Sequence, residues 1–201
     1  MIKQCNFQKS RIRIIAILFA TILWISSYSN QEIVTYMNVN GRTFTITTVN
    51  TPNNTPVEVW EYTDEINATE LSQLDAYAEQ NYPAASKVRN ATGLYNCHSY
   101  AWYYQAIFNN KWMNEPTPYT TDGSYEFVAS GGSSSIPLNV PNASKVLWGN
   151  DENGYPAHSG TVISSTTIRS KWGPGGLFDH APGYSPFSDY DDILKYYDYA
   201  N

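Results

Sequence analysis

The segment from Gln31 to Val49 carries the pattern that most constrains how this chain folds. Two runs of alternating residues, Ile33-x-Thr35-x-Met37-x-Val39 and Thr43-x-Thr45-x-Thr47-x-Val49, flank the dipeptide Asn40-Gly41. Asn-Gly between alternating runs is the strongest short-range signal for a β-hairpin, because both residues accept the positive φ angles of a tight turn. We therefore predict a β-hairpin region over residues 30–66, with a further strand at Val57–Tyr62.

Helical patterns come next, and strand patterns follow them. A helix capped by Thr69 is predicted by the apolar spacing of Leu71, Leu74, Tyr77 and Ala78, and a second helix by Asn96, which is a good capping residue. The second helix carries Cys97 and ends near Asn109-Asn110. A long loop over 114–142, strands at 144–148, 158–164 and 167–172, a loop over 173–186 and a terminal helix over 189–199 complete the prediction. This order favours one α+β domain over 67–201.

The N-terminus has the pattern of a secretory signal peptide. Four basic residues (Lys3, Lys9, Arg11 and Arg13) precede an apolar run from Ile14 to Ile25, and the small residues Ser27 and Ser29 follow. A basic region, a short apolar region and small residues are typical of a cleaved export signal, and the apolar run is short for a membrane span. We expect residues 1–29 to be removed and the protein to be secreted, periplasmic or at the cell surface. The alternative is an uncleaved signal anchor, which would be its contact with a membrane.

Charge excludes one class of partner. The leader holds four of the 12 Lys and Arg residues, which leaves eight against 18 Asp and Glu, a net charge of −10 for the remainder. Nucleic acids need a basic surface, so nucleic-acid binding is not expected.

Cysteine usage singles out Cys97. The chain has two cysteines, and Cys5 would leave with the signal, so an intramolecular disulfide is excluded in the mature part. A lone cysteine in an exported protein indicates a free reactive thiol, an intermolecular partner or a small buried apolar residue. The predicted place of Cys97 at a helix start favours the thiolate, because unpaired N–H groups and the positive end of the helix dipole lie there.

A thiol nucleophile requires a base, and the chain has three histidines. His98 follows Cys97 directly and points about 100° away on a helix, so we expect it to pack or hydrogen-bond at the edge of the site. His158 opens a predicted strand and is the preferred base. Ser170, twelve residues further and on the predicted adjacent strand, and His180 are both candidates for the group that orients the base, and the residues do not decide between them.

Two other chemistries are weakly supported. Cys97 and His98 are adjacent and rarely ligate one ion well, and no C-x-x-C or H-E-x-x-H pattern is present, so neither a metal nor a cofactor is expected. The glycines at Gly131-Gly132 lack the spacing and the lysine of a phosphate-binding loop.

Three short motifs in order resemble the NlpC/CHAP-type branch of the papain-like cysteine hydrolases: Asn96–Ala101, His158–Ile163 and Ser170–Gly173. The resemblance covers roughly residues 69–188. It implies a papain-like α+β fold, with N-terminal helices packed on an antiparallel sheet or small barrel. It also implies amide hydrolysis through a thioester, typically on bacterial cell-wall peptides, with Cys97 as nucleophile, His158 as base and Ser170 at the third position.

These observations predict an exported cysteine peptidase or amidase that acts on a peptide or peptidoglycan-like substrate. Aromatic side chains such as Trp102 and Trp172, together with His98, are candidates for lining a substrate groove, although core packing would also account for them. Two alternatives stay open. One is a non-catalytic extracellular binding module on the same fold, and the other is a secreted effector that modifies a protein partner through the same pair of residues.

Overall fold

The computed structural model describes residues 35–37, 41–150, 154, 156–188 and 193–200. The predicted signal peptide, residues 1–29, lies outside the described residues. Within the described part, no helix has the length and hydropathy needed to span a membrane.

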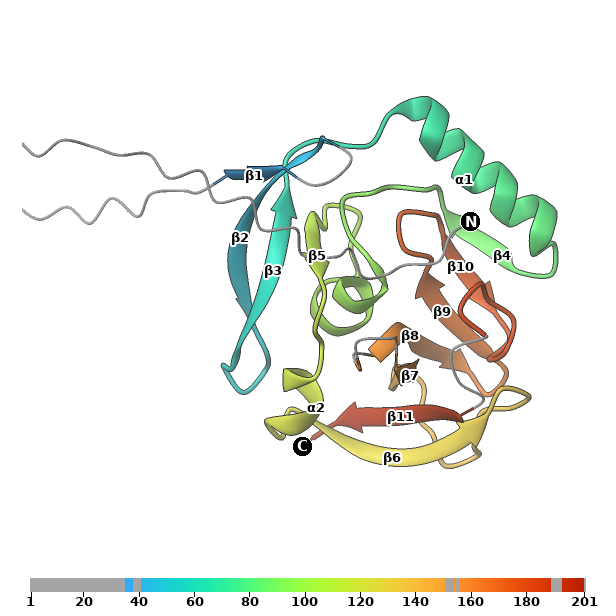
Figure 1. Ribbon diagram of the computed structural model, residues 1–201. Coiled ribbons are helices and arrows are strands. Elements are labelled where there is room, and N and C mark those ends of the chain that lie inside the picture. The colour runs from blue at the N-terminus through green and yellow to red at the C-terminus, as the bar shows by residue number, and fades with distance from the viewer. Residues whose placement is uncertain (1–34, 38–40, 151–153, 155, 189–192, 201) are drawn as a thin grey trace, which may run out of the picture.

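The predicted hairpin forms one edge of a four-stranded antiparallel sheet. Strands β1 (Thr35–Met37), β2 (Thr43–Asn50), β3 (Pro56–Tyr62) and β5 (Lys111–Met113) lie in the order β1-β2-β3-β5. Tyr36 pairs with Phe44 across the turn, and Gly41 has a φ of 74°, which glycine adopts without steric cost. Strand β5 lies far along the chain, so the hairpin is joined to the rest of the protein through its sheet (Figure 1).

Seven antiparallel strands form the second sheet. They are β4 (Ser86–Arg89), β6 (Tyr125–Gly132), β7 (Lys145–Asn150), β8 (Pro156–Ser164), β9 (Thr167–Lys171), β10 (Leu177–His180) and β11 (Ile193–Tyr199). Their order is β4-β10-β9-β8-β7-β11-β6, with β4 and β6 at the two edges. The sheet is therefore open. The coarse α+β prediction is confirmed, with an antiparallel sheet and not a barrel.

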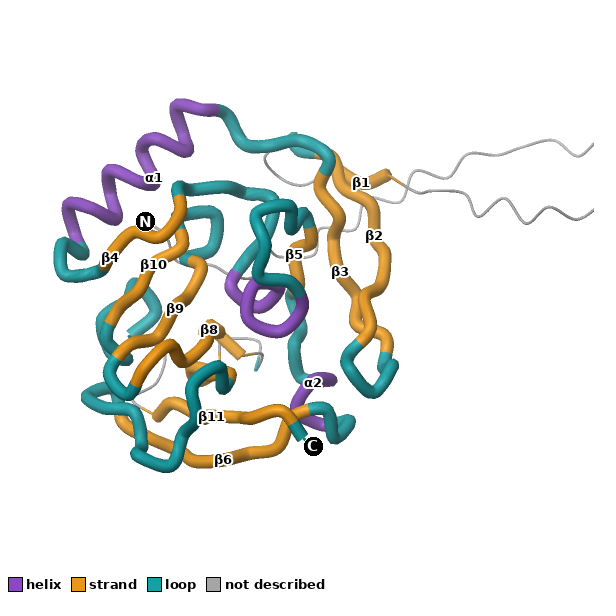
Figure 2. The backbone as a smooth tube through the Cα atoms, turned by 180° about the vertical axis from the view of Figure 1, so that it is seen from behind, coloured by secondary structure: helices purple, strands orange, loops and turns teal. Residues whose placement is uncertain are grey.

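Helices are fewer and shorter than predicted. Helix α1 (Ala68–Asn81) begins after Asn67, whose Oδ1 accepts the Glu70 backbone N–H at 2.9 Å, so Asn67 and not Thr69 is the capping residue. The second predicted helix covers only residues 97–103, and its part η1 (Ser99–Tyr103) is wound as a π-helix. Helix α2 (Pro118–Thr121) is a single turn. Figure 2 shows α1 on the outside, beside β4, and η1 at the centre.

Three predictions on the C-terminal half are wrong. Residues 193–199 of the predicted helix are strand β11, in which Leu194 and Tyr196 are buried and Ile193 and Lys195 are exposed, the period of two that a strand requires. The predicted loop over 114–142 contains α2 and β6, and β6 is polar because it is an edge strand paired only with β11. The predicted loop over 173–186 contains β10, which pairs with both β4 and β9.

The core joins both sheets. One cluster contains Val57 and Val59 from the hairpin, Ala101 and Trp102 from the central helical turn, and Leu147 from β7. A second cluster lies on the other face of the seven-stranded sheet and contains Val146, Trp148, Val162 and Ile168. The helical turn 97–103 is therefore clamped between two sheets, which fixes the position of the residues at its start.

Candidate functional site

Asn96 fixes the start of the helical turn that carries Cys97. Its Oδ1 accepts the backbone N–H groups of Ser99 at 3.1 Å and Met113 at 3.2 Å, and its Nδ2 donates to the carbonyl of Met113 at 2.6 Å. One fully buried amide thus caps the helix and also pairs with strand β5. The first backbone–backbone bond of the turn runs from Tyr100 N to Asn96 O, so Cys97 is the first residue of the helix, as the sequence predicts.

Cys97 and His158 come together in the interior. Both side chains are 0% exposed, and Cys97 lies close enough to the His158 imidazole to raise the pKa of that ring. Cys97 enters from the helix start, and His158 comes from β8, the strand at the middle of the seven-stranded sheet. The predicted approach of these two residues is therefore present in the fold.

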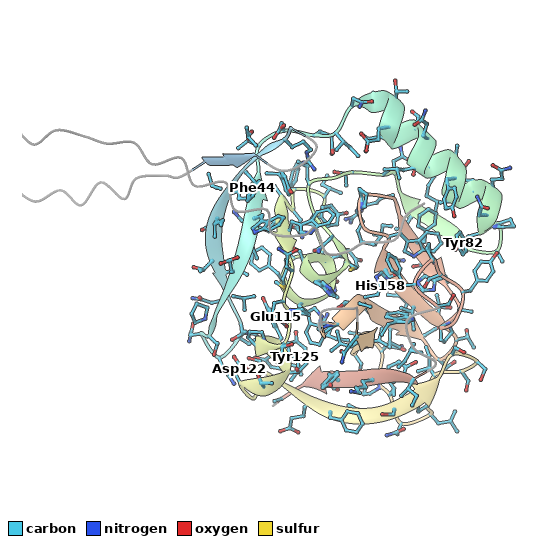
Figure 3. The ribbon with its side chains drawn as sticks, in the orientation of Figure 1. Phe44, Tyr82, Glu115, Asp122, Tyr125 and His158 are labelled. Carbon is cyan, nitrogen blue, oxygen red and sulfur yellow. The ribbon has the colours of Figure 1, made fainter. Side chains whose placement is uncertain are left out.

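Aromatic rings hold the His158 imidazole from two sides. The Phe187 ring stacks on it with centroids 3.9 Å apart and planes inclined by 12°, and Trp148, its cross-strand partner, lies at 4.7 Å. Among the described residues, neither imidazole nitrogen has an oxygen or nitrogen partner. His158 is thus oriented by packing, with the sulfur of Cys97 as the polar group beside it (Figure 3 labels His158).

Electrostatics favour a neutral base. Burial lowers the pKa of His158, because desolvation disfavours the imidazolium. Cys97 opposes this shift through its charge and its hydrogen bond, and the charge of nearby His98 adds to the lowering. A neutral imidazole beside a thiol is the state that accepts a proton from sulfur.

Ser170 and His180, the two candidates for the third group, bond each other. Ser170 Oγ lies 2.7 Å from His180 Nε2, and Trp172 Nε1–H donates to Ser170 Oγ at 3.1 Å. His180 Nδ1 donates to the carbonyl of Ala181 at 2.8 Å, so its Nε2 accepts the proton of the Ser170 hydroxyl. Burial lowers the pKa of His180 to about 4. Burial thus keeps His180 neutral, although its bond to the Ala181 carbonyl acts in the opposite direction.

His98 belongs to a matching network on β8. Its Nδ1 lies 2.6 Å from Ser159 Oγ, which also accepts the Trp102 Nε1–H at 2.9 Å. Ser159 Oγ thus joins the His98 ring to the Trp102 indole, and His98 Nε2 is the nitrogen on the other side of that ring. No described residue pairs with this Nε2. His98 is thus hydrogen-bonded within the site and is not placed to act as the base.

The aromatic residues predicted to line a groove lie inside the protein. Trp102 packs on Tyr119, Tyr125 and Tyr197, and Trp172 stacks on Phe178 at 4.1 Å. Their indole N–H groups are used by Ser159 and Ser170. In this conformation both tryptophans build the core around the site.

Sequence reasoning missed three residues that shape the site: Asn96 as a clamp on β5, Ser159 as the partner of His98, and Phe187. The first two stand next to Cys97 and His158 in the chain, so their adjacency was an available signal. Phe187 had none, because a loop brings it onto His158 from beyond β10.

The site is closed to solvent. An open depression of about 410 Å³ lies nearby, lined by Val88, Arg89, Asn90, Thr92, Tyr95 and Ile107, and includes neither Cys97 nor His158. In the described part of the chain, no group of three His, Cys, Asp or Glu side chains is arranged to hold a metal ion.

Comparison with known proteins gives no match: no family model, no curated protein and no solved structure is similar to this chain. The case for its function therefore rests on its own residues.

Proposed function

We propose that this protein is an exported thiol-dependent hydrolase that cleaves an amide bond, with Cys97 as nucleophile and His158 as general base. The observation that carries the proposal is the approach of the Cys97 thiol to an imidazole whose nitrogens have no oxygen or nitrogen partner. The other two histidines are engaged by serine hydroxyls, which leaves His158 as the one suited to exchange protons with sulfur.

The reaction follows from this pair. His158 takes the thiol proton as the sulfur attacks the carbonyl carbon, and the carbonyl oxygen becomes an oxyanion. The oxyanion collapses, the C–N bond breaks, and the amine leaves with the proton from His158. Water then attacks the thioester, again with His158 as base, and the thiol is regenerated as the acid departs. Backbone N–H groups at the start of the helix, where no intrahelical acceptor exists, would stabilise the oxyanion.

The resemblance to NlpC/CHAP-type hydrolases supports peptides of the cell wall, or other extracellular peptides, as substrates. The complete burial of Cys97 favours the alternative of a non-catalytic binding module, in which the cysteine is a packing residue. The hydrolase and the binding module make opposite predictions for the reactivity of the Cys97 thiol.

Thiol labelling separates them. In the full chain with Cys5→Ser, Cys97 is the only cysteine, and we expect iodoacetamide to modify it near neutral pH slowly but to completion, since the side chain is 0% exposed. We also expect a peptidoglycan digest or peptide mixture to yield new amines with this protein and none with the Cys97→Ala variant. A Cys97 that resists iodoacetamide while the protein stays folded, with amine release unchanged in Cys97→Ala, would refute the hydrolase. The matched control is Met113→Leu, a fully buried sulfur residue outside the pair.

A further inference from the structure

The segment 181–188, here called the 181–188 loop, carries Phe187, whose ring lies on the His158 imidazole. Its first half is anchored: the Tyr184 hydroxyl accepts the backbone N–H of Ala84 at 3.3 Å, and Gly183 packs so closely on Ser133 that a Cβ there would lie 2.7 Å from the Ser133 carbonyl oxygen. Its second half turns inward, with Phe187 N donating to Ser185 Oγ at 3.3 Å. This turn directs the Phe187 ring to the site.

Phe187 packs on His158 and shares a buried apolar cluster with Cys97. It is 1% exposed. His158 and Cys97 come from the sheet and the central helical turn, whereas Phe187 comes from a loop at the edge of the domain. The residue that closes the site is therefore carried by a different element from the residues that would react.

A substrate must occupy the same place. The carbonyl carbon has to reach the sulfur, and the leaving nitrogen has to reach the imidazole, so the bound substrate lies against both side chains. Phe187 already lies against the His158 imidazole, in the buried cluster that also contains Cys97. The substrate and the Phe187 ring cannot be present together.

We propose that Phe187 is an autoinhibitory residue that occupies the position of a substrate side chain, and that the substrate carries an aromatic or large apolar side chain beside the scissile carbonyl. This proposal rests on the proposed function. The loop swings Phe187 out when such a side chain enters, and without it the thiol stays covered.

The walls that Phe187 contacts support this choice of substrate. The buried residues that share its cluster besides Cys97 are Ala78, Trp172 and Phe178, none of which carries a charge. An apolar chamber accepts an aromatic ring at a gain in free energy, whereas a carboxylate or ammonium would lose its hydration without a partner. The site therefore selects against charged side chains next to the scissile bond.

The test measures the rate at which iodoacetamide alkylates Cys97 in the full chain with Cys5→Ser. We expect Phe187→Ala to raise this rate by about tenfold or more, because the covering ring is gone, and Phe187→Trp to leave it low. Phe44→Ala is the matched control. Phe44 is also buried and stacked, on Trp60 at 4.7 Å, but in the other sheet, so its loss should change the rate less than about twofold. Phe187→Leu is measured as well, because deletion of a buried ring destabilises a fold.

Substrate class is tested by protection. In the Phe187→Ala variant, acetyl-phenylalaninal, which forms a reversible hemithioacetal with a thiol, should protect Cys97 at a concentration about tenfold lower than acetyl-aspartal does. Equal protection by the two aldehydes would overturn the aromatic preference. An alkylation rate that is the same in Phe187→Ala and the parent, both folded, would overturn the autoinhibition.

These failures are distinguishable from failure of the proposed function. Fast alkylation in Phe187→Ala with no amide cleaved by either protein contradicts the hydrolase but keeps Phe187 as the cover of the thiol. If the parent and Phe187→Ala cleave the amide at the same rate, the proposed hydrolase activity stands and the proposed autoinhibition by Phe187 is contradicted.

Discussion

His158 and His180 are both buried histidines of the seven-stranded sheet, yet their surroundings differ. His180 has each nitrogen in a hydrogen bond, one to Ser170 and one to the Ala181 carbonyl. His158 is held by the faces of Phe187 and Trp148, and its nitrogens have no oxygen or nitrogen partner among the described residues. A saturated imidazole is fixed as a structural group, whereas one held by packing keeps its nitrogens available to a reacting atom.

The same difference sets how much free energy it costs to bury each imidazole. The hydrogen bonds of His180 compensate for burying a polar ring, and an uncompensated buried polar group costs about 1–3 kcal/mol. His158 has only the thiol beside it. A buried polar group without an oxygen or nitrogen partner requires an explanation, and a role in a reaction is one such explanation.

The largest expected effect is on the rate of amide hydrolysis, which should depend on His158 much more than on His180. We expect His158→Gln to reduce amide hydrolysis by about 10²-fold or more, because the general base is lost, while His180→Gln reduces it less than about tenfold. Rates of product release from the same peptide mixture, with folding checked by circular dichroism, provide the measurement. Equal losses in both variants would mean that His158 acts through packing, as His180 does.

Acid should destabilise the protein through its buried histidines. The pKa of His180 is about 4 in the fold, against 6.5 as its ordinary value, so above pH 6.5 the ring is neutral in both states. Between pH 6.5 and 4 the unfolded state alone takes up the proton, and the free energy of unfolding falls by about 1.4 kcal/mol per pH unit, about 3 kcal/mol in all. Urea denaturation at a series of pH values measures this slope.

The control for the acid prediction is His180→Asn, which does not titrate in this range. Its unfolding free energy should depend less steeply on pH than that of the parent. An unchanged slope would assign the acid sensitivity to other groups, His158 first, because burial lowers the pKa of His158 as well.

Ser170→Ala should cost about 2 kcal/mol of stability, because it leaves both His180 Nε2 and the Trp172 indole N–H without their partner in the interior. The measurement is the midpoint and slope of urea denaturation. Ser164→Ala is the matched control, since that hydroxyl is only partly buried and bonds Thr166 nearby. A loss of amide hydrolysis that exceeds the loss of folded protein would show that Ser170 assists His158.

The smallest effect concerns the indole donors. Trp172→Phe and Trp102→Phe each remove one N–H bond to a serine and keep most of the ring, so each should cost about 1 kcal/mol. Denaturation of both variants would compare the two networks directly. A much larger cost for Trp172→Phe would mean that its stacking on Phe178 carries more stability than the hydrogen bond.

Much of the site follows from local patterns. Asn96 before Cys97 indicated a helix start, and His158 was placed at the opening of a strand after a turn. In the fold the two side chains come together. Ser170 was placed on the strand adjacent to His158, and β9 does pair with β8. The partner of Ser170 was not predictable, because the register of β9 with β10 brings His180 onto the same face. The C-terminal strand was missed although Leu194 and Tyr196 alternate with Lys195, because a segment so short fits both periods.

By itself, the sequence determined that Cys97 is the one cysteine after residue 29, that it begins a helix, and that His158 lies near the start of a strand. These properties follow from residues that are close together in the sequence, because helix capping and the alternation of side chains in a strand are local effects. Only the tertiary structure decided which serine bonds which imidazole, and that Phe187 stacks on His158. Such choices depend on strand register and on the path of a loop, and both are set by packing between residues distant in the sequence.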